Sequence, residues 1–292
     1  MADDKKILIT GTTGLLGNHF LNQNKLDCEI YAIVRTLPKS QVDHIKYIVT
    51  DLTDPDMINM LPDKIDIIIH LAQSDRFRDF PDEALDVFRV NIASTAKLID
   101  FAYRVGAKKF IYASSGGVYG TGNDAFHENS PIIPPGKLGY YLGSKFCSET
   151  LASSYSSVMQ IIILRFFFMY GRGQKKSMLI PRLVENIKNN IPINLQGNNG
   201  IRINPIHVND AVRVLAASID INSSNVFNIG GAEILSLRDI ADIIGNKLNI
   251  NPIFDIQESV PNDLIGNISS MNERLVPPII DFEEGIKSLL TT

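Results

Sequence analysis

The sequence is poor in cysteine and in potential metal ligands. Its 292 residues include only two cysteines, Cys28 and Cys147, and five histidines. Two thiols are too few for a disulfide framework or a thiolate metal site, so we expect a protein of the reducing cytoplasm. The histidines have no acidic or cysteine companions at ligand spacing, which predicts that the protein binds no metal.

The chain also lacks an excess of positive charge and a long apolar run. Its formal net charge is −4, which argues against nucleic acid or an anionic membrane surface as the main partner. The richest apolar stretch, 161–170, is interrupted by Arg165 and is too short to span a bilayer. We therefore expect a protein that binds neither nucleic acid nor a membrane.

Short β-branched runs alternate with amphipathic segments in the first half of the chain. Several of these runs are almost continuously apolar, which is typical of parallel strands buried on both faces. The alternation predicts an α/β fold with a doubly wound, Rossmann-like parallel sheet, in which ligands bind at the carboxyl ends of the strands. The predicted strands are 6–10, 29–35, 46–49, 65–71, 109–114 and 160–167, and the predicted helices are 14–24, 81–105 and 140–156.

Beyond residue 170 the pattern changes. We predict helices at 178–189, 207–217 and 236–248, a strand at 226–230 and a last helix from Phe282. The stretch 190–200 and the proline-containing tail have the composition of turns and loops. We therefore expect a dinucleotide-binding domain at 1–170, to which 204–231 returns. A smaller C-terminal substrate-binding lid would be formed mainly by 171–203 and 232–292.

A glycine-rich turn follows the first predicted strand. Gly11, Gly14 and Gly17 are spaced three residues apart and lead into a predicted helix. Glycines permit a tight turn and let backbone N–H groups approach a pyrophosphate at the helix N-terminus. A strand-to-helix turn can need glycine for its geometry alone, but this position in the chain favours a dinucleotide site.

Tyr141 and Lys145 lie four residues apart on a predicted helix and therefore share one face. A nearby cation favours the phenolate and brings the phenol pKa from about 10 toward the range useful for general acid–base catalysis. Such pairs occur by chance on many helices. Here the pair follows Ser114-Ser115 and the glycine turn in one order along the chain, so we predict a catalytic proton donor.

These three motifs resemble those of the extended branch of the short-chain dehydrogenase/reductase superfamily, the NAD(P)-dependent nucleotide-sugar epimerase/dehydratase family. His70-Leu71-Ala72 at the end of the fourth strand and Tyr170-Gly171 also fit this resemblance, which runs almost from end to end. It implies a nucleotide-sugar substrate, an NAD(P) cofactor and a homodimer formed through the helices at 81–105 and 140–156.

The resemblance also implies residue roles. Tyr141 would be the general acid/base, Lys145 would hold the nicotinamide ribose and lower the tyrosine pKa, and Ser115 would bind the reacting sugar oxygen. Ser115 has a second possible role, as a cap of the turn before Gly116. Gly116, Phe168 and Arg202 would be further substrate contacts. The other implied cofactor contacts are Gly11, Thr13, Gly14, Leu15, Leu16, Gly17, Arg35, Asp51, Leu52, Leu71, Ala72, Asn91 and Ser114.

Three positions depart from the family pattern. Arg35 ends the second strand where NAD-preferring members carry an acidic residue, and a guanidinium can bind a 2′-phosphate, so we expect NADP(H) to be favoured over NAD(H). Phe168 replaces a frequent asparagine. Val260-Pro-Asn-Asp263 stands where the family has Arg-Pro-Gly-Asp, which leaves Arg202 to do more of the anion binding.

The expected reaction is reduction of a 4-keto sugar, or C4 epimerisation through a transient ketone, on a nucleotide-linked sugar. Dehydration is not expected, because Gly116 and Gly117 stand where the family's dehydratases carry an Asp-Glu pair. Two alternatives stay open, a reductase of a non-nucleotide carbonyl compound and a non-catalytic NAD(P)-sensing protein. The intact proton donor argues against a sensor, which needs only the glycine turn.

Overall fold

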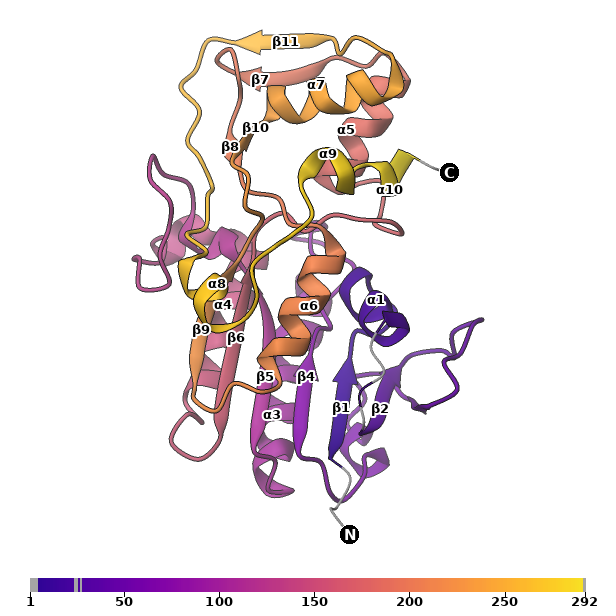
Figure 1. The fold of residues 1–292 in the computed structure, drawn as a ribbon. Coiled ribbons are helices and arrows are strands. Elements are labelled where there is room, and N and C mark those ends of the chain that lie inside the picture. Colours follow the sequence, from indigo (N-terminus) through magenta and orange to yellow (C-terminus); the bar gives the residue numbers. More distant parts are fainter. Residues whose placement is uncertain (1–4, 24–25, 27, 291–292) are drawn as a thin grey trace. The chain divides into compact units, whose positions relative to one another are not determined.

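The computed structural model describes residues 5–23, 26 and 28–290. The chain forms two compact units, each described here by itself. The first comprises Met1–Val118, Ile133–Arg165 and Leu215–Phe227, and the second comprises Tyr119–Ile132, Phe166–Val214 and Asn228–Thr292. Most of the helices and strands are labelled in Figure 1.

A seven-stranded sheet in the order β3-β2-β1-β4-β5-β6-β9 is the main architectural element. All the registers from β3 to β5 are parallel, with Ile7 paired to both Ile30 and Ile67. This topology confirms the predicted Rossmann-like α/β class. The strands are β1 (Lys6–Thr10), β2 (Glu29–Val34), β3 (Ile45–Val49), β4 (Ile67–His70), β5 (Lys109–Ser115), β6 (Gln160–Phe166) and β9 (Asn225–Ile229).

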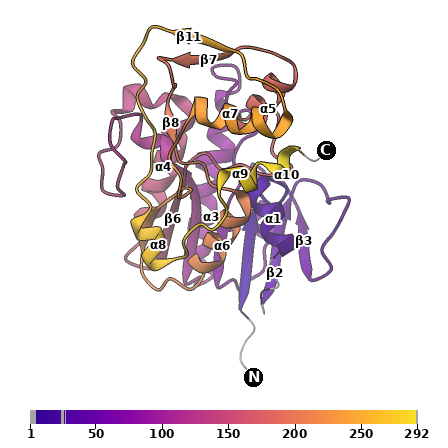
Figure 2. The ribbon, with the colours of Figure 1, turned by 45° about the horizontal axis from the view of Figure 1, so that its top comes forward.

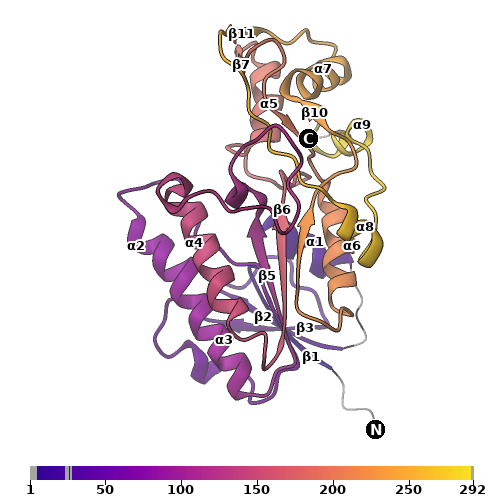
Figure 3. The same cartoon turned by 90° about the vertical axis from the view of Figure 1, so that its left-hand side faces the viewer.

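The strands are apolar on both faces because helices cover both. Figure 3 shows α2 (Ala84–Val87), α3 (Ser94–Arg104) and α4 (Pro135–Ser153) on one face and α1 (Leu15–Gln23) on the other. Leu8, Ile68 and Phe110 are fully buried and belong to one core cluster with Leu98 of α3. Burial of this apolar area supplies the main favourable free energy of the first unit.

The helices match the prediction with local differences. The predicted helix 81–105 is α2, a π-helical turn η2 (Phe88–Ala93) and α3 in succession. Within α4, Gly139 has a φ of 67°, so the regular helix that carries Tyr141 begins at residue 140, as predicted, and ends at Ser153. The predicted helix 14–24 is α1, and its residue 24 lies outside the described residues. Two 3₁₀ turns, η1 (Met57–Met60) and η3 (Gly116–Tyr119), complete this part.

The second unit is built around α5 (Leu179–Lys188) and α7 (Leu237–Leu248), which pack in one apolar cluster. A capping box, in which Ser236 and Asp239 exchange hydrogen bonds, begins α7. Figure 2 shows the parallel pair β7 (Ile193–Gln196) and β11 (Phe254–Gln257) beside these helices. The remaining elements are β8 (Arg202–Ile203), β10 (Leu235–Ser236), α6 (Val208–Ser218), which continues into the first unit, α8 (Ser269–Arg274), α9 (Phe282–Gly285) and α10 (Lys287–Leu290).

The expectation of turns at 190–200 and of a loop-rich tail is only partly right. The sequence interpretation missed the short strands β7, β8, β10 and β11 and the helix α8. Ile193 and Leu195 are buried and alternate with exposed residues, which is the period-two pattern of a strand. This strand has only four residues between Pro192 and Gly197. That length was too short for the alternating pattern to outweigh the turn signals of the proline and the glycine.

In the part of the chain that the structure describes, no helix is both long and apolar enough to cross a bilayer.

Candidate active site

The glycine turn between β1 and α1 brings backbone unusually close to backbone. Gly11 has a φ of +73°, and a Cβ there would lie 2.6 Å from the amide nitrogen of Ala72. A Cβ on Gly17 would lie 2.4 Å from the carbonyl oxygen of Gly11. Both positions therefore require glycine, and the turn presents the N-terminal N–H groups of α1 at the carboxyl end of β1.

His70 at the end of β4 connects this turn to the helices. Its Nδ1 lies 2.7 Å from the Thr10 hydroxyl, and its Nε2 lies 2.9 Å from the Thr95 hydroxyl. Thr95 donates its only hydroxyl proton to the Asn91 carbonyl oxygen, so His70 Nε2–H must donate to Thr95, and Nδ1 accepts from Thr10. Burial, with the charge of Lys145 adding to it, lowers the pKa of His70 to about 3, and the imidazole stays neutral.

The network continues to the end of β4. Thr10 Oγ1 accepts the N–H of Ala72 at 3.2 Å, which fixes the backbone next to the glycine turn. Two buried hydroxyl groups, Thr12 Oγ1 in the glycine turn and Ser114 Oγ in the Ser114-Ser115 motif, have no hydrogen-bond partner. A polar ligand would satisfy such groups, so the residues present fit a dinucleotide bound along the carboxyl ends of the strands.

Tyr141 lies half-buried at the start of the regular part of α4. Its hydroxyl donates to Gln73 Oε1 at 3.0 Å, and its ring packs against Phe77 with centroids 4.7 Å apart. Burial raises the pKa of Tyr141 to about 12, and the charge of Arg78 acts in the opposite direction. The phenol is therefore protonated at neutral pH.

Lys145 is buried one turn further along α4. Its Nζ donates to the Ala113 carbonyl oxygen at 2.9 Å and lies 5.1 Å from the Tyr112 ring centroid. Burial lowers the pKa of Lys145 to about 8, and Glu149 opposes this shift. For Tyr141 the resolved contributions to the pKa are burial and the opposing charge of Arg78, and a lowering of that pKa by Lys145 stays a prediction.

Ser115 ends β5 and is followed by the η3 turn. Its Oγ accepts the N–H of Gly117 at 3.2 Å, which is the capping contact considered above. This bond uses one acceptor site and leaves the hydroxyl proton available, so capping and substrate binding are compatible. Gly116 is buried, and a Cβ on Gly117 would lie 2.9 Å from Leu142 Cδ2.

Arg35 and Asp51 lie at the ends of β2 and β3. Arg35 Nη2 is 3.0 Å from Asp75 Oδ2, and both side chains are more than half exposed. Asp51 Oδ1 accepts the N–H and the hydroxyl of Thr53, each at 2.7 Å. Burial raises the pKa of Asp51, but the Thr53 hydrogen bonds and the Arg35 charge outweigh it, so the pKa is lowered.

Asn91, in the π-helical turn η2, uses its side-chain amide for hydrogen bonds within the fold. Its Oδ1 accepts the N–H of Ser74, and its Nδ2 donates to Ser144 Oγ, both at 2.8 Å. It thus joins the segment after β4 to α4. Among the other implied cofactor contacts, Leu16 packs in the core, Thr13 and Gly14 are exposed, and Leu15, Leu52, Leu71 and Ala72 are half-buried.

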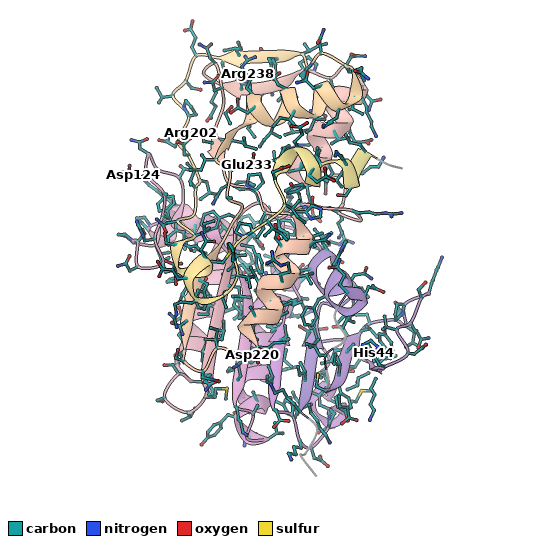
Figure 4. All side chains as sticks on the ribbon, in the orientation of Figure 1. His44, Asp124, Arg202, Asp220, Glu233 and Arg238 are labelled. Atoms are coloured by element: carbon teal, nitrogen blue, oxygen red, sulfur yellow. The ribbon has the colours of Figure 1, made fainter. Side chains whose placement is uncertain are left out.

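The implied substrate residues Phe168 and Arg202 belong to the second unit. Phe168 is half-buried and has a φ of 45°, which is rare for a residue with a large side chain. Arg202, labelled in Figure 4, lies on β8. It donates through Nε to Asp263 Oδ2 at 2.8 Å, and its backbone N–H donates to Asp263 Oδ1 at 2.8 Å. Asp263 therefore holds the arginine that the sequence interpretation assigned to an anion.

Among the side chains that contact its candidates, the sequence interpretation did not name Gln73 and Asp75. Both follow β4, and the rule that ligands bind beyond the carboxyl ends of strands would have marked them. Asp263 was named as part of a family segment, but no local signal paired it with Arg202. Among the described residues, no group of His, Cys, Asp or Glu side chains could hold a metal ion.

The family model described as the NAD dependent epimerase/dehydratase family matches residues 7–230. The chain belongs to this family. This confirms the resemblance inferred from the motifs, and family members named below are enzymes.

Curated relatives in this family catalyse different reactions. The chain is 27% identical over 241 residues to a dTDP-4-dehydro-6-deoxyglucose reductase of Escherichia coli, covering 77% of this chain and 74% of that one. It is 28% identical over 246 residues to a dTDP-D-glucose 4,6-dehydratase of Mus musculus, covering 77% and 68%. Relatives at similar identity thus differ in reaction.

Solved structures share the fold over nearly the whole chain. UDP-glucuronic acid 4-epimerase from Bacillus cereus, in complex with UDP-glucuronic acid and NAD, has a TM-score of 0.84 at 24% identity. The match covers 97% of each chain. MoeE5 in complex with UDP-glucuronic acid and NAD gives the same TM-score at 23% identity.

The glycine turn generates a first prediction. In Gly17→Ala the new Cβ would meet backbone, not a flexible side chain, so the turn must shift and its N–H groups lose their alignment. We expect dinucleotide affinity to fall by about tenfold or more, equivalent to roughly 1.4 kcal/mol. Fluorescence titration with NADPH and NADH measures it. Gly136→Ala is the matched control, because a Cβ there meets nothing within 4 Å. Unchanged affinity in Gly17→Ala would contradict the assignment.

Proposed function

We propose that this protein is a cytoplasmic, NAD(P)-dependent reductase or C4 epimerase of a nucleotide-linked sugar. The observation that carries the proposal is the phenol of Tyr141, held beside the carboxyl end of β4 by Gln73 and followed on the same helix by buried Lys145. The glycine turn between β1 and α1 supplies the dinucleotide site of the same unit. Neither a pure sensor nor a scaffold needs the proton donor.

The proposed roles follow from the contacts of each group. When bound, the nicotinamide supplies or accepts a hydride. Tyr141 donates its phenol proton to the carbonyl oxygen in reduction and takes it back in oxidation. Ser115 orients that oxygen through its free hydroxyl proton. Lys145 binds the ribose with the N–H groups that it does not donate to Ala113.

The protonation state of Tyr141 is the one that a proton donor needs. A phenol with a pKa of about 12 is almost entirely protonated at neutral pH, which is the form that reduction of a ketone consumes. Oxidation of a carbinol consumes tyrosinate instead. This protonation state therefore agrees with the ketone-reduction step that 4-keto reduction and C4 epimerisation share.

The substrate assignment rests on Arg202, for which we propose contact with the diphosphate. About half of its side chain is exposed, and Asp263 fixes its guanidinium through Nε and Nη2. The outer N–H groups remain directed away from Asp263 and can bind an anion. The carboxylate also partly neutralises the arginine, and this supports the second candidate, a reductase of a non-nucleotide carbonyl compound.

We retain the two-domain assignment as part of the proposal, with residues 171–203 and 232–292 forming mainly the substrate side. We also propose a homodimer through the helices at 81–105 and 140–156. Leu85 and Phe88 on α2 and η2 and Tyr103 on α3 expose apolar surface, which supports an interface there.

Tyr141→Phe tests the catalytic assignment. The substitution removes only the phenol oxygen, so we expect turnover to fall by roughly 10²–10⁴-fold while cofactor affinity stays nearly unchanged. Steady-state rates and a cofactor titration on the same preparation separate the two effects. Tyr140→Phe is the control, since Tyr140 has no lysine four residues on. Near-wild-type turnover in Tyr141→Phe would refute the role.

Arg35 is proposed to select NADP(H). A charged hydrogen bond to the 2′-phosphate favours the phosphorylated cofactor by about 1.5–3 kcal/mol, although the phosphate must compete with Asp75 for the guanidinium. We expect Arg35→Ala to remove the preference and Asp75→Asn to increase it. Isothermal titration of both cofactors against the three proteins decides the matter. Tighter NAD binding by the wild-type chain would sink the idea.

A screen tests the substrate class. UDP-, dTDP-, GDP- and CDP-sugars are added with each cofactor, and a rise in unfolding temperature marks a ligand that binds the folded state. We expect a nucleotide sugar to raise it in wild type and much less in Arg202→Ala. If none does while non-nucleotide ketones are reduced, the second candidate is correct.

The same samples test for dehydration. Mass spectrometry should show no loss of water, because positions 116 and 117 are glycines and carry no carboxylate. Glu128, the glutamate nearest in sequence to positions 116 and 117, accepts the N–H of Asn228 within the second unit. Formation of a 4-keto-6-deoxy product from dTDP-glucose or GDP-mannose would overturn this exclusion.

A further inference from the structure

The segment 73–80, which follows β4, packs on the two tyrosines at the start of the regular part of α4. Gln73 accepts the Tyr141 hydroxyl, and Phe77 packs on the Tyr141 ring. Phe80 stacks on Tyr140, with centroids 5.0 Å apart and an interplanar angle of 24°. The proton donor is therefore in contact with a segment 68 residues earlier in the chain.

The backbone around Gln73 is fixed on both sides. The N–H of Ala72 donates to Thr10 Oγ1, and the N–H of Ser74 donates to Asn91 Oδ1. The Ser74 hydroxyl in turn donates to Asp86 and accepts the N–H of Arg76. The Gln73 side chain thus starts from a backbone held by β1 and η2, although the residue itself is exposed.

We propose that Gln73 is a positioning residue of the catalytic centre, which orients the Tyr141 hydroxyl and controls the pH range in which it gives up its proton. This inference rests on the proposed function, in which Tyr141 is the proton donor. It adds a residue for which neither the motifs nor the named relatives provide a role.

The sign of the effect follows from the geometry. In the observed bond the phenol is the donor and the amide oxygen the acceptor, so the bond stabilises the protonated form. The charged and titratable groups that act on Tyr141 are Arg78 of the same segment and Tyr112 of β5. Lys145, one turn further along α4, donates to the Ala113 carbonyl oxygen. None of these three accepts the phenol proton, so Gln73 is the acceptor that a substitution can remove.

Two substitutions at Gln73 should move the pH at which Tyr141 ionises in opposite directions. Gln73→Met keeps a side chain of similar length but removes the amide, so ionisation of Tyr141 should begin about half to one pH unit lower. Gln73→Glu keeps an acceptor and adds a negative charge, so ionisation should begin at higher pH. Asp82→Asn, an exposed change in the same loop, should leave ionisation where it is in wild type.

The readout is carbon NMR of the full-length protein with tyrosine labelled at Cζ, from neutral to alkaline pH. The chain has nine tyrosines and no tryptophan, and the resonance absent from Tyr141→Phe is that of Tyr141. At neutral pH the same resonance should also shift in Gln73→Met, because the hydroxyl has lost its acceptor. A Gln73→Met protein with unchanged resonance and unchanged onset of ionisation overturns the proposal.

Activity then separates this inference from the proposed function. If a substrate is found, the pH profile of kcat/KM should move in the same direction as the NMR titration in both Gln73 variants, which a purely structural role would not produce. If the NMR shifts occur but the protein transfers no hydride to any substrate, the contact is real and only the proposed function fails.

Discussion

His70 accepts from Thr10 at one ring nitrogen and donates to Thr95 at the other, so one buried side chain connects β1, β4 and α3. A protonated imidazole would donate at both nitrogens, and the Thr10 hydroxyl would then have to accept from Nδ1 and direct its own proton elsewhere. Because burial keeps the ring neutral, the direction of every bond is set. The close approach of Gly11 to Ala72 depends on this arrangement. Thr10, which precedes Gly11, is bound by His70 and also accepts the N–H of Ala72.

Local signals in the sequence were sufficient for the fold and for naming the residues of the candidate site. The main strands were predictable because Ile7, Leu8 and Ile9 and their counterparts are apolar on both faces, a pattern that only parallel strands covered by helices require. The glycine turn and the Tyr141–Lys145 spacing are likewise readable within a few residues. Even the start of the regular helix at residue 140 has a local cause, the left-handed conformation of Gly139.

The sequence could not predict which distant side chains contact the candidate site residues. Tyr141 meets Gln73 across 68 residues, Arg202 meets Asp263 across 61, and Arg35 meets Asp75 across 40. Each pair is created by the topology of the sheet or of the second unit, and no periodicity in the chain records it. The upward shift of the Tyr141 pKa was unpredictable for the same reason, because it depends on burial beneath residues from another segment.

The buried Lys145 has a consequence for the free energy of folding. Its pKa is about 8 in the folded state and ~10.4 in an unfolded chain. Between these values the unfolded chain binds the proton and the folded one does not, so unfolding takes up a proton and stability rises with pH across this interval. Below it both states are charged, and the folded state carries the full cost of a desolvated ammonium group. At neutral pH the buried lysine therefore opposes folding, a cost in stability that its proposed role in binding the ribose would explain.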